Sequence, residues 1–378
     1  MTAPVVGVVG GGQLARMLHQ AAISLGVRVV VLDPDPDCAA ALAGAQRFDG
    51  TWTSLDDLVA FAASGVDVVT FDHELAAPED LRTLEERSPV PVHPAAATKL
   101  LAQDKLHARA GLREHELPVP AFTTVDAAAD VEAFAAAHGW PVVLKARRGG
   151  YDGRGVWIVR DAAHAAEVVA GAQGGDGLLA EELVDIDREL AVMVARRPSG
   201  QIRAWPTMRT TQVDGICTEV ILAPPTAIED EAQALAIELA ERIDLTGVMA
   251  VELFVTRDGD LVLNELACRP HNSGHVTMDS CVTGQFEQHL RAVLDLPLGD
   301  PSPLVGAAVM VNVLGGDAPW DAGGLAAALG IDRTTLHLYG KGHRPGRKLG
   351  HVNATAATVD EARALARRAA DALGSPVG

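Results

Sequence analysis

Residues 145–156 read K-A-R-R-G-G-Y-D-G-R-G-V, and this stretch decides the fold that we expect. An apolar run at 141–144 precedes it and the run V-W-I-V at 156–159 follows, so we predict a strand, a glycine-rich loop and a second strand. Glycines tolerate positive φ and let backbone N–H groups approach an anion closely. The cations of the stretch are Lys145, Arg147, Arg148 and Arg154. The stretch therefore indicates a phosphate-binding loop, with a solvated hairpin tip as the alternative.

Composition limits the classes of function. The chain has 378 residues, for which we expect two or three domains, and 48% of them are hydrophobic. The formal net charge of −19 argues against a nucleic-acid partner or an anionic membrane surface. We find no signal peptide, no transmembrane run and no CxxC pair among the four cysteines. We therefore expect a cytoplasmic protein with reduced thiols.

The N-terminal residues predict a β-α-β unit. A buried-strand pattern at 5–9 runs into Gly10-Gly11-Gly12, a helix follows, and a second strand at 27–32 ends at Asp33. This order resembles a dinucleotide-binding fingerprint, although Ala15 replaces its third glycine. A nicotinamide-dependent oxidoreductase is therefore one alternative.

Two features mark the middle of the chain. A further strand at 66–71 ends in Asp72-His73-Glu74, at the edge where open parallel sheets bind ligands. A helix is expected at 98–110, and a small α+β unit from 118 to 182. That unit ends in a strand that leads into Glu181-Glu182-Leu183-Val184, with Glu189 in the next strand. Such acids can accept hydrogen bonds from an adenine amine and ribose hydroxyls, or they are simply solvated.

A predicted hairpin places two carboxylates face to face. Strands at 248–254 and 261–266 flank a turn at 257–260, so Glu252 and Glu265 are expected on one face. With the amide oxygen of Asn264 they offer hard oxygen ligands for magnesium. A structural ion pair is the alternative.

Two polar segments complete the candidate site. Residues 269–275 read R-P-H-N-S-G-H, too polar and glycine-broken for a core element, and we expect them to hydrogen-bond a polar substrate. Residues 341–351 read K-G-H-R-P-G-R-K-L-G-H, the most basic stretch of an acidic chain. We predict a loop there that binds a phosphate monoester, with an exposed basic turn as the alternative.

Together these motifs resemble the ATP-grasp superfamily and, within it, the N5-carboxyaminoimidazole ribonucleotide synthetase family. The blocks that carry the resemblance are G-G-G-Q-L-A-R-M at 10–17, G-G-Y-D-G-R-G at 149–155, N-E-L at 264–266, R-P-H-N-S-G-H at 269–275, Q-F-E-Q-H at 285–289 and R-P-G-R-K-L-G-H at 344–351. The resemblance implies an α/β and α+β chain in three parts. These are a Rossmann-like pre-ATP-grasp domain at 1–97, an ATP-grasp domain at 98–298 whose lid spans about 118–182, and a small β-rich domain at 299–378 that carries the basic loop.

The resemblance also implies residue roles. The nucleotide-binding residues would be Lys105, Lys145, Gly150, Tyr151, Asp152, Gly153, Arg154, Gly155, Val156, Glu181, Glu182, Leu183, Val184, Glu189, Gln212, Asn264 and Glu265. Glu252 and Glu265 would bind Mg²⁺. The ribonucleotide would contact Gln13, Leu14, Glu74, Asn272, Ser273, Lys341, Arg347 and Lys348. The catalytic residues would be Tyr151, Asp152, Arg269 and His271, with His275 as a weaker candidate.

The implied reaction carboxylates 5-aminoimidazole ribonucleotide in de novo purine synthesis. ATP and bicarbonate would give carboxyphosphate, ADP and phosphate would be released, and a homodimer would hand its product to a mutase. Other ATP-grasp ligases, such as a formate-using glycinamide ribonucleotide transformylase, remain the nearest alternative. A nucleotide-binding module without activity is a third possibility.

Overall fold

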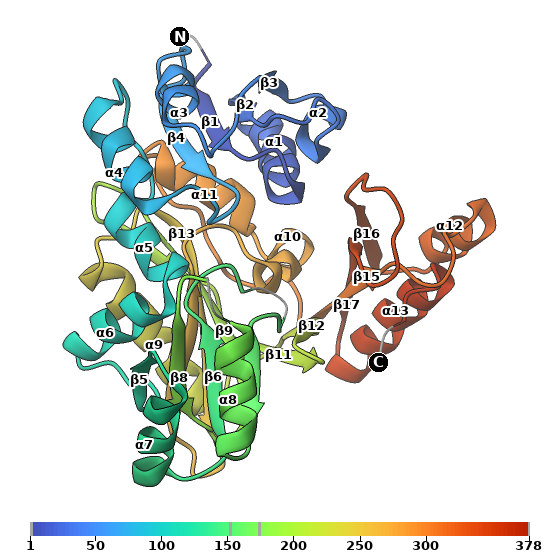
Figure 1. Cartoon of the computed structure of the whole chain (residues 1–378). Coiled ribbons are helices and arrows are strands. Elements are labelled where there is room, and N and C mark those ends of the chain that lie inside the picture. The colour runs from blue at the N-terminus through green and yellow to red at the C-terminus, as the bar shows by residue number, and fades with distance from the viewer. Residues whose placement is uncertain (1–2, 151–152, 173–174, 377–378) are drawn as a thin grey trace.

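The computed structural model describes residues 3–150, 153–172 and 175–376, and it arranges their strands in three sheets (Figure 1). The first is parallel, with the order β3 (Gln46–Phe48), β2 (Arg28–Leu32), β1 (Val5–Val9) and β4 (Val68–Phe71). Its helices are α1 (Gln13–Leu25), α2 (Ala39–Leu42), α3 (Leu55–Ala62) and α4 (Pro78–Arg87). Strand β1 is buried along its whole length, because apolar clusters lie on both faces of the sheet.

The backbone N–H groups of the glycine turn after β1 donate hydrogen bonds to acidic residues that follow two other strands of this sheet. The N–H of Gly11 donates to Oδ2 of Asp33 at 2.8 Å, and the N–H of Gly12 donates to Oδ2 of Asp72 at 2.7 Å. In a dinucleotide-binding fingerprint the acid after the second strand binds a ribose instead. This turn therefore gives no support to the oxidoreductase alternative.

The helix predicted at 98–110 is in fact two helices. Helix α5 (Ala96–Gln103) ends where α6 (Lys105–Glu114) begins, and Asp104 between them has extended φ and ψ of −125° and 108°. Its carboxylate accepts the N–H groups of Leu106 and His107, each at 3.1 Å. The prediction of one helix was wrong because Asp104 caps the second helix.

The lid forms the second sheet, which is antiparallel. Its strand order is β5 (Phe122–Val125), β8 (Leu178–Glu182), β6 (Val142–Ala146) and β7 (Val156–Val159). Helices α7 (Ala128–His138) and α8 (Ala162–Gly171) pack on it around one apolar cluster. The predicted strand, loop and strand around residues 145–156 are thus confirmed in the described residues, while Tyr151 and Asp152 lie outside them.

The third sheet runs from the predicted hairpin into the C-terminal region. Its order is β14 (Leu261–Ala267), β13 (Gly247–Thr256), β9 (Ile186–Arg196), β11 (Met208–Val213), β12 (Ile216–Leu222), β15 (Ala307–Leu314), β17 (Lys348–Ala356) and β16 (Thr334–Leu338), with β10 (Ile202–Ala204) on β9. Helix α9 (Ala227–Arg242) packs on β9, β13 and β14 at one end of this sheet. Helices α12 (Ala322–Leu329) and α13 (Val359–Ala372) pack on its C-terminal strands. Helix α12 was not predicted from the sequence.

The segment after β14 connects the first and third sheets. It contains the 3₁₀ turn η1 (Asn272–Val276), α10 (Thr277–Ser280) and α11 (Gln285–Val293). Helix α11 lies beside α1 (Figure 1), and Phe286, Leu290 and Val293 enter the apolar cluster under α1. Among the described residues, no helix is long and apolar enough to cross a membrane.

Candidate active site

Residues that follow the strands of the first sheet line one cavity of about 1250 Å³ together with residues of the lid and of the third sheet. The predicted site residues that line it are Gln13, Leu14, Glu74, Lys105, Lys145, Gly150, Gly153, Arg154, Val156, Glu181, Glu182, Leu183, Val184, Glu189, Gln212, Glu252, Asn264, Glu265, Arg269, His271, Asn272, His275 and Lys348. Of the other predicted residues that the structure describes, Gly155, Ser273, Lys341 and Arg347 are not among those that line it. Most of the site residues predicted from the sequence therefore lie around the same cavity.

Lys145 lies on a buried network at the lid side of the cavity. Its Nζ is 2.8 Å from Oε2 of Glu181 and donates to Oδ1 of Asn264 at 3.2 Å. Burial lowers the pKa of Lys145, against the raising effect of Glu181. On its other oxygen Glu181 accepts from Nε of Arg109 at 2.6 Å. Burial alone would raise the Glu181 pKa, but Arg109 and Lys145 hold it below its ordinary value.

Arg109 was missed by the sequence analysis. It is 2% exposed, and it reaches Glu181 from helix α6 across 72 positions of the chain. The sequence carries one signal, because Lys105 and Arg109 are four residues apart and so share a helix face.

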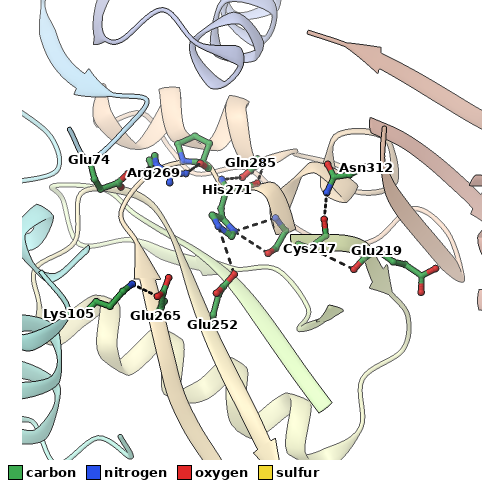
Figure 2. A network of polar contacts seen from close by, with 12 residues as sticks. Glu74, Lys105, Cys217, Glu219, Glu252, Glu265, Arg269, His271, Gln285 and Asn312 are labelled. Atoms are coloured by element: carbon green, nitrogen blue, oxygen red, sulfur yellow. Dashed lines mark hydrogen bonds and ion pairs between the residues drawn. The ribbon is translucent and has the colours of Figure 1, made fainter. Parts of the chain in front are cut away.

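The predicted carboxylate pair is confirmed in the third sheet. Glu252 and Glu265 are directly opposite each other across β13 and β14 (Figure 2). Glu265 forms an ion pair with Lys105. Although burial would raise the Glu265 pKa, Lys105 and Lys145 lower it.

Glu252 has a different electrostatic environment. Burial, and then the charges of Glu265 and Glu189, raise its pKa to about 8. Its Oε1 lies 3.9 Å from Nε2 of His271. Among the described residues, no group of three or more His, Cys, Asp or Glu side chains is arranged to hold a metal.

Apolar side chains line the lid side near the predicted adenine-binding residues. Ile158 and Leu183 are 46% and 45% exposed, and both line the cavity. Such surfaces suit the faces of a purine ring. Glu189 lies nearby with its carboxylate hydrogen-bonded to Gln212, and burial raises its pKa. Ile158 was not predicted as a site residue.

Arg269 joins the segment after β14 to the end of β4. Its Nε donates to Oε2 of Glu74 at 2.7 Å (Figure 2). Burial would raise the pKa of Glu74, but Arg269 and Lys99 lower it, so Glu74 is ionised. The predicted ligand-binding edge of the first sheet therefore meets the residues 269–275.

His271 is held in a neutral state beside the hairpin. Burial, followed by the charges of Arg269 and Lys348, lowers its pKa to about 3. Its Nδ1 lies 3.0 Å from Oγ of Ser273, a predicted site residue that does not line the cavity. Its backbone is bound by Gln285, a buried residue to which the sequence analysis gave no role.

The basic stretch divides into two parts. The prediction of a loop is wrong from Lys348 onward, because residues 348–351 begin strand β17, and Lys348 lines the cavity. Arg347 donates from Nη1 to the carbonyl oxygen of Gly342 at 3.1 Å. Nζ of Lys341 lies 5.6 Å from the ring centroid of Tyr339, a cavity residue that was not predicted.

Comparison with known proteins gives the same arrangement of parts. Residues 3–103 match the ribonucleotide synthetase preATP-grasp domain, residues 110–286 the ATP-grasp domain and residues 308–365 the phosphoribosylaminoimidazole carboxylase C-terminal domain. The N5-carboxyaminoimidazole ribonucleotide synthase of Mycobacterium tuberculosis (strain ATCC 25618 / H37Rv) is 46% identical over 367 residues, which cover 93% of this chain and 83% of that protein. The corresponding protein of Corynebacterium ammoniagenes is 43% identical, with 98% and 92% covered.

Solved structures agree over almost the whole chain. The N5-carboxyaminoimidazole ribonucleotide synthetase of Thermus thermophilus superposes with a TM-score of 0.87 at 35% identity, covering 98% of this chain and 99% of that one. The N5-carboxyaminoimidazole synthase of Aspergillus clavatus, in complex with ADP and aminoimidazole ribonucleotide, gives a TM-score of 0.90 at 31% identity, with 99% of each chain covered. The chain belongs to the N5-carboxyaminoimidazole ribonucleotide synthase family of the ATP-grasp superfamily.

Proposed function

We propose that this chain is a ligase that carboxylates 5-aminoimidazole ribonucleotide to N5-carboxyaminoimidazole ribonucleotide in purine biosynthesis. ATP and bicarbonate are the other substrates, and ADP and phosphate leave. The observation that supports this best is a single cavity lined by Lys145, by Glu252 and Glu265, and by Arg269 and Lys348. The family relationship supports it independently, and the Aspergillus clavatus relative is described in complex with ADP and aminoimidazole ribonucleotide.

The nucleotide would occupy the lid side of the cavity. Its purine would lie against Ile158 and Leu183, and its phosphates near Lys145, which is buried and faces Asn264. Gly150, Gly153 and Arg154 also line this side. The assigned roles of Tyr151 and Asp152 stay predictions.

Glu252 and Glu265 are the residues that would hold Mg²⁺, with Asn264 beside them. The residues fit a cation, because burial, and then the charges of Glu265 and Glu189, raise the pKa of Glu252, and a bound cation would stabilise its ionised form. When bound, the ion would neutralise charge on the phosphates. The side chain of Lys105 already neutralises Glu265 and lines the same cavity.

The ribonucleotide would lie between Gln13, Leu14, Asn272 and Lys348. Bicarbonate is a poor electrophile, so it has to be activated. Its oxygen would attack the γ-phosphate of ATP and give carboxyphosphate. The amine of the ribonucleotide would then take its carboxyl group from carboxyphosphate, and phosphate would leave. Arg269 is fixed by Glu74 and offers a positive charge to the anionic reactants. The chain then has to align the reactants and exclude water from a labile anhydride.

Four further parts of the proposal rest on the sequence and on the family resemblance. We infer a homodimer and a cytoplasmic location, and we infer that a mutase receives the unstable product. We also propose the domain boundaries at 97/98 and 298/299.

Phosphate release from ATP tests the proposal. With Mg²⁺ and bicarbonate present, we expect release to depend on aminoimidazole ribonucleotide. Release that depends instead on glycinamide ribonucleotide and formate would move the assignment to the transformylase. No release under either condition, with ADP still bound, would refute the activity.

A further inference from the structure

Gln285 holds two histidines of residues 269–275 with one amide group. It is fully buried at the start of α11, and its Oε1 accepts the backbone N–H of His271 at 2.8 Å (Figure 2). Its Nε2 donates to the carbonyl oxygen of His271 and lies 2.8 Å from Nδ1 of His275. A side chain at Gly274 would collide with this amide, so the glycine makes the contact possible.

These contacts fix the tautomer of His275. A backbone N–H can only donate, so the oxygen of the Gln285 amide must face His271 and its NH₂ group must face His275. Nδ1 of His275 then accepts a hydrogen bond and carries no proton. In a neutral imidazole the proton therefore sits on Nε2.

The surroundings keep this ring neutral and immobile. His275 is 2% exposed, and burial is the largest of several causes that lower its pKa well below the ordinary value. The ring of His351 stacks on it with a centroid distance of 4.6 Å and an interplanar angle of 21°. Nδ2 of Asn353 donates to its carbonyl oxygen at 2.9 Å.

We propose that Gln285 is a positioning residue that presents His275 to the cavity as an Nε2–H donor while it holds the backbone of His271. Both histidines line the cavity together with Lys348. The donor would serve an oxygen of the ribonucleotide or of bicarbonate. This inference rests on the proposed function only for the identity of that acceptor.

The tautomer can be tested without any activity. In protein labelled with ¹⁵N-histidine, two-bond ¹H–¹⁵N NMR correlations distinguish Nε2–H from Nδ1–H rings, and the His275 signal is assigned by its loss in His275→Asn. We expect Nε2–H at neutral pH. An Nδ1–H ring would overturn the proposal even if the enzyme proved to use another substrate.

Helix α11 offers a matched control for the positioning role. Gln288 is also fully buried, and its amide binds the N–H and carbonyl of Gly299 at 2.7 and 3.0 Å, but it is not among the cavity-lining residues. The test compares Gln285→Glu with Gln288→Glu. A carboxylate can still accept the N–H of the bound residue but cannot donate back.

The two variants should affect different properties of the protein. We expect Gln285→Glu to move the His275 proton to Nδ1 and to lower kcat/KM at least tenfold with the KM for ATP within twofold. Whether the KM for ribonucleotide or for bicarbonate rises identifies the acceptor. Gln288→Glu should lower Tm only. An unchanged His275 signal in Gln285→Glu, or a kcat/KM within twofold of Gln288→Glu, would refute the positioning role. If Gln285→Glu does not fold, the tautomer in the wild-type protein decides.

Discussion

Glu252 and Glu265 are opposite each other on neighbouring strands, but their charges are compensated differently. Glu265 has Lys105 as an ion-pair partner, whereas Oε1 of Glu252 lies 3.9 Å from a histidine whose pKa is about 3. One carboxylate of the pair is therefore ionised, while the other has a pKa raised to about 8. This asymmetry gives the protein a measurable dependence on pH.

In metal-free protein, Glu252 should contribute a loss of stability as the pH rises from about 4.5 to about 8. The folded state keeps a proton on Glu252 that the unfolded state releases near the ordinary glutamate pKa of 4.5, so unfolding is favoured progressively across this window. Glu252→Gln should remove that dependence and stabilise the protein at pH 8.5 by roughly 2 kcal/mol. This is less than the full shift implies, because 25% of the side chain is exposed.

Urea unfolding at pH 5 and pH 8.5 with a chelator present measures this difference. Glu238→Gln is the control, since Glu238 is 51% exposed in a helical ion pair with Arg242. Equal pH dependence in wild type and Glu252→Gln would contradict the prediction.

Lys145→Met should weaken ADP binding about 10- to 100-fold, since a charged hydrogen bond contributes roughly 1.5–3 kcal/mol. Methionine keeps most of the buried volume, and Glu181 retains Arg109 as its partner. Isothermal titration with ADP and Mg²⁺ measures the change. Lys99→Met is the control, because Lys99 is also buried but is bound to the carbonyl oxygen of His73, away from the lid. If both variants lose the same affinity for ADP, Lys145 stabilises the fold and does not bind the nucleotide directly.

Lys348→Ala should raise the KM for aminoimidazole ribonucleotide at least tenfold and leave the KM for ATP within twofold. The reason is that Lys348 lines the cavity, in the part where we propose that the ribonucleotide binds. Arg347→Ala should have a smaller effect, because its guanidinium is bound to Gly342 and the residue does not line the cavity. Steady-state kinetics with each substrate varied measures both, and an equal or larger effect of Arg347→Ala would show that the whole basic stretch binds the phosphate.

Asp104→Asn should raise the KM for ATP several-fold. Oδ2 of Asp104 lies 2.7 Å from Nη2 of Arg147 and 3.2 Å from Nε of Arg148, so it holds the base of the glycine-rich loop on helix α6. Asparagine still caps a helix but cannot pair with two guanidinium groups. Asp161→Asn, at the N-cap of α8, is the matched control and should leave the KM unchanged. If the KM for ATP in Asp104→Asn equals that of the control, the contacts of Asp104 with Arg147 and Arg148 do not affect ATP binding.

The sequence predicts those parts of the site that depend on short-range pattern. Glu252 and Glu265 could be paired because a short turn joins their strands, so alternation alone sets which side chains share a face. The break at Asp104 was missed because the apolar pattern continues through it, although an aspartate at that point is also a typical cap. Lys348 was placed in a loop because of its neighbouring glycines. Yet a side chain at Gly350 would lie 2.5 Å from the carbonyl oxygen of His337, so that glycine permits close strand pairing.

Contacts between distant segments could not be predicted in this way. Arg109 and Glu181 are 72 positions apart, and Gln285 binds His271 through backbone atoms that have no sequence signature. Nothing in the periodicity of either segment specifies its partner. These contacts follow from how the three sheets pack together, which the family resemblance implied only in outline.

The third sheet has a consequence for protein engineering. Strand β12 pairs with β15 in a register that places Glu219 beside Val311, so the C-terminal strands continue the sheet that carries the Glu252–Glu265 hairpin. A chimera that joins segments of two relatives between these strands would have to reproduce that register. Otherwise the backbone N–H and C=O groups on one side of β12 would stay unpaired, and the strand could pair with another chain. Recombination among relatives should therefore tolerate crossovers within the surface loops, whereas the sheet itself is inherited as one unit.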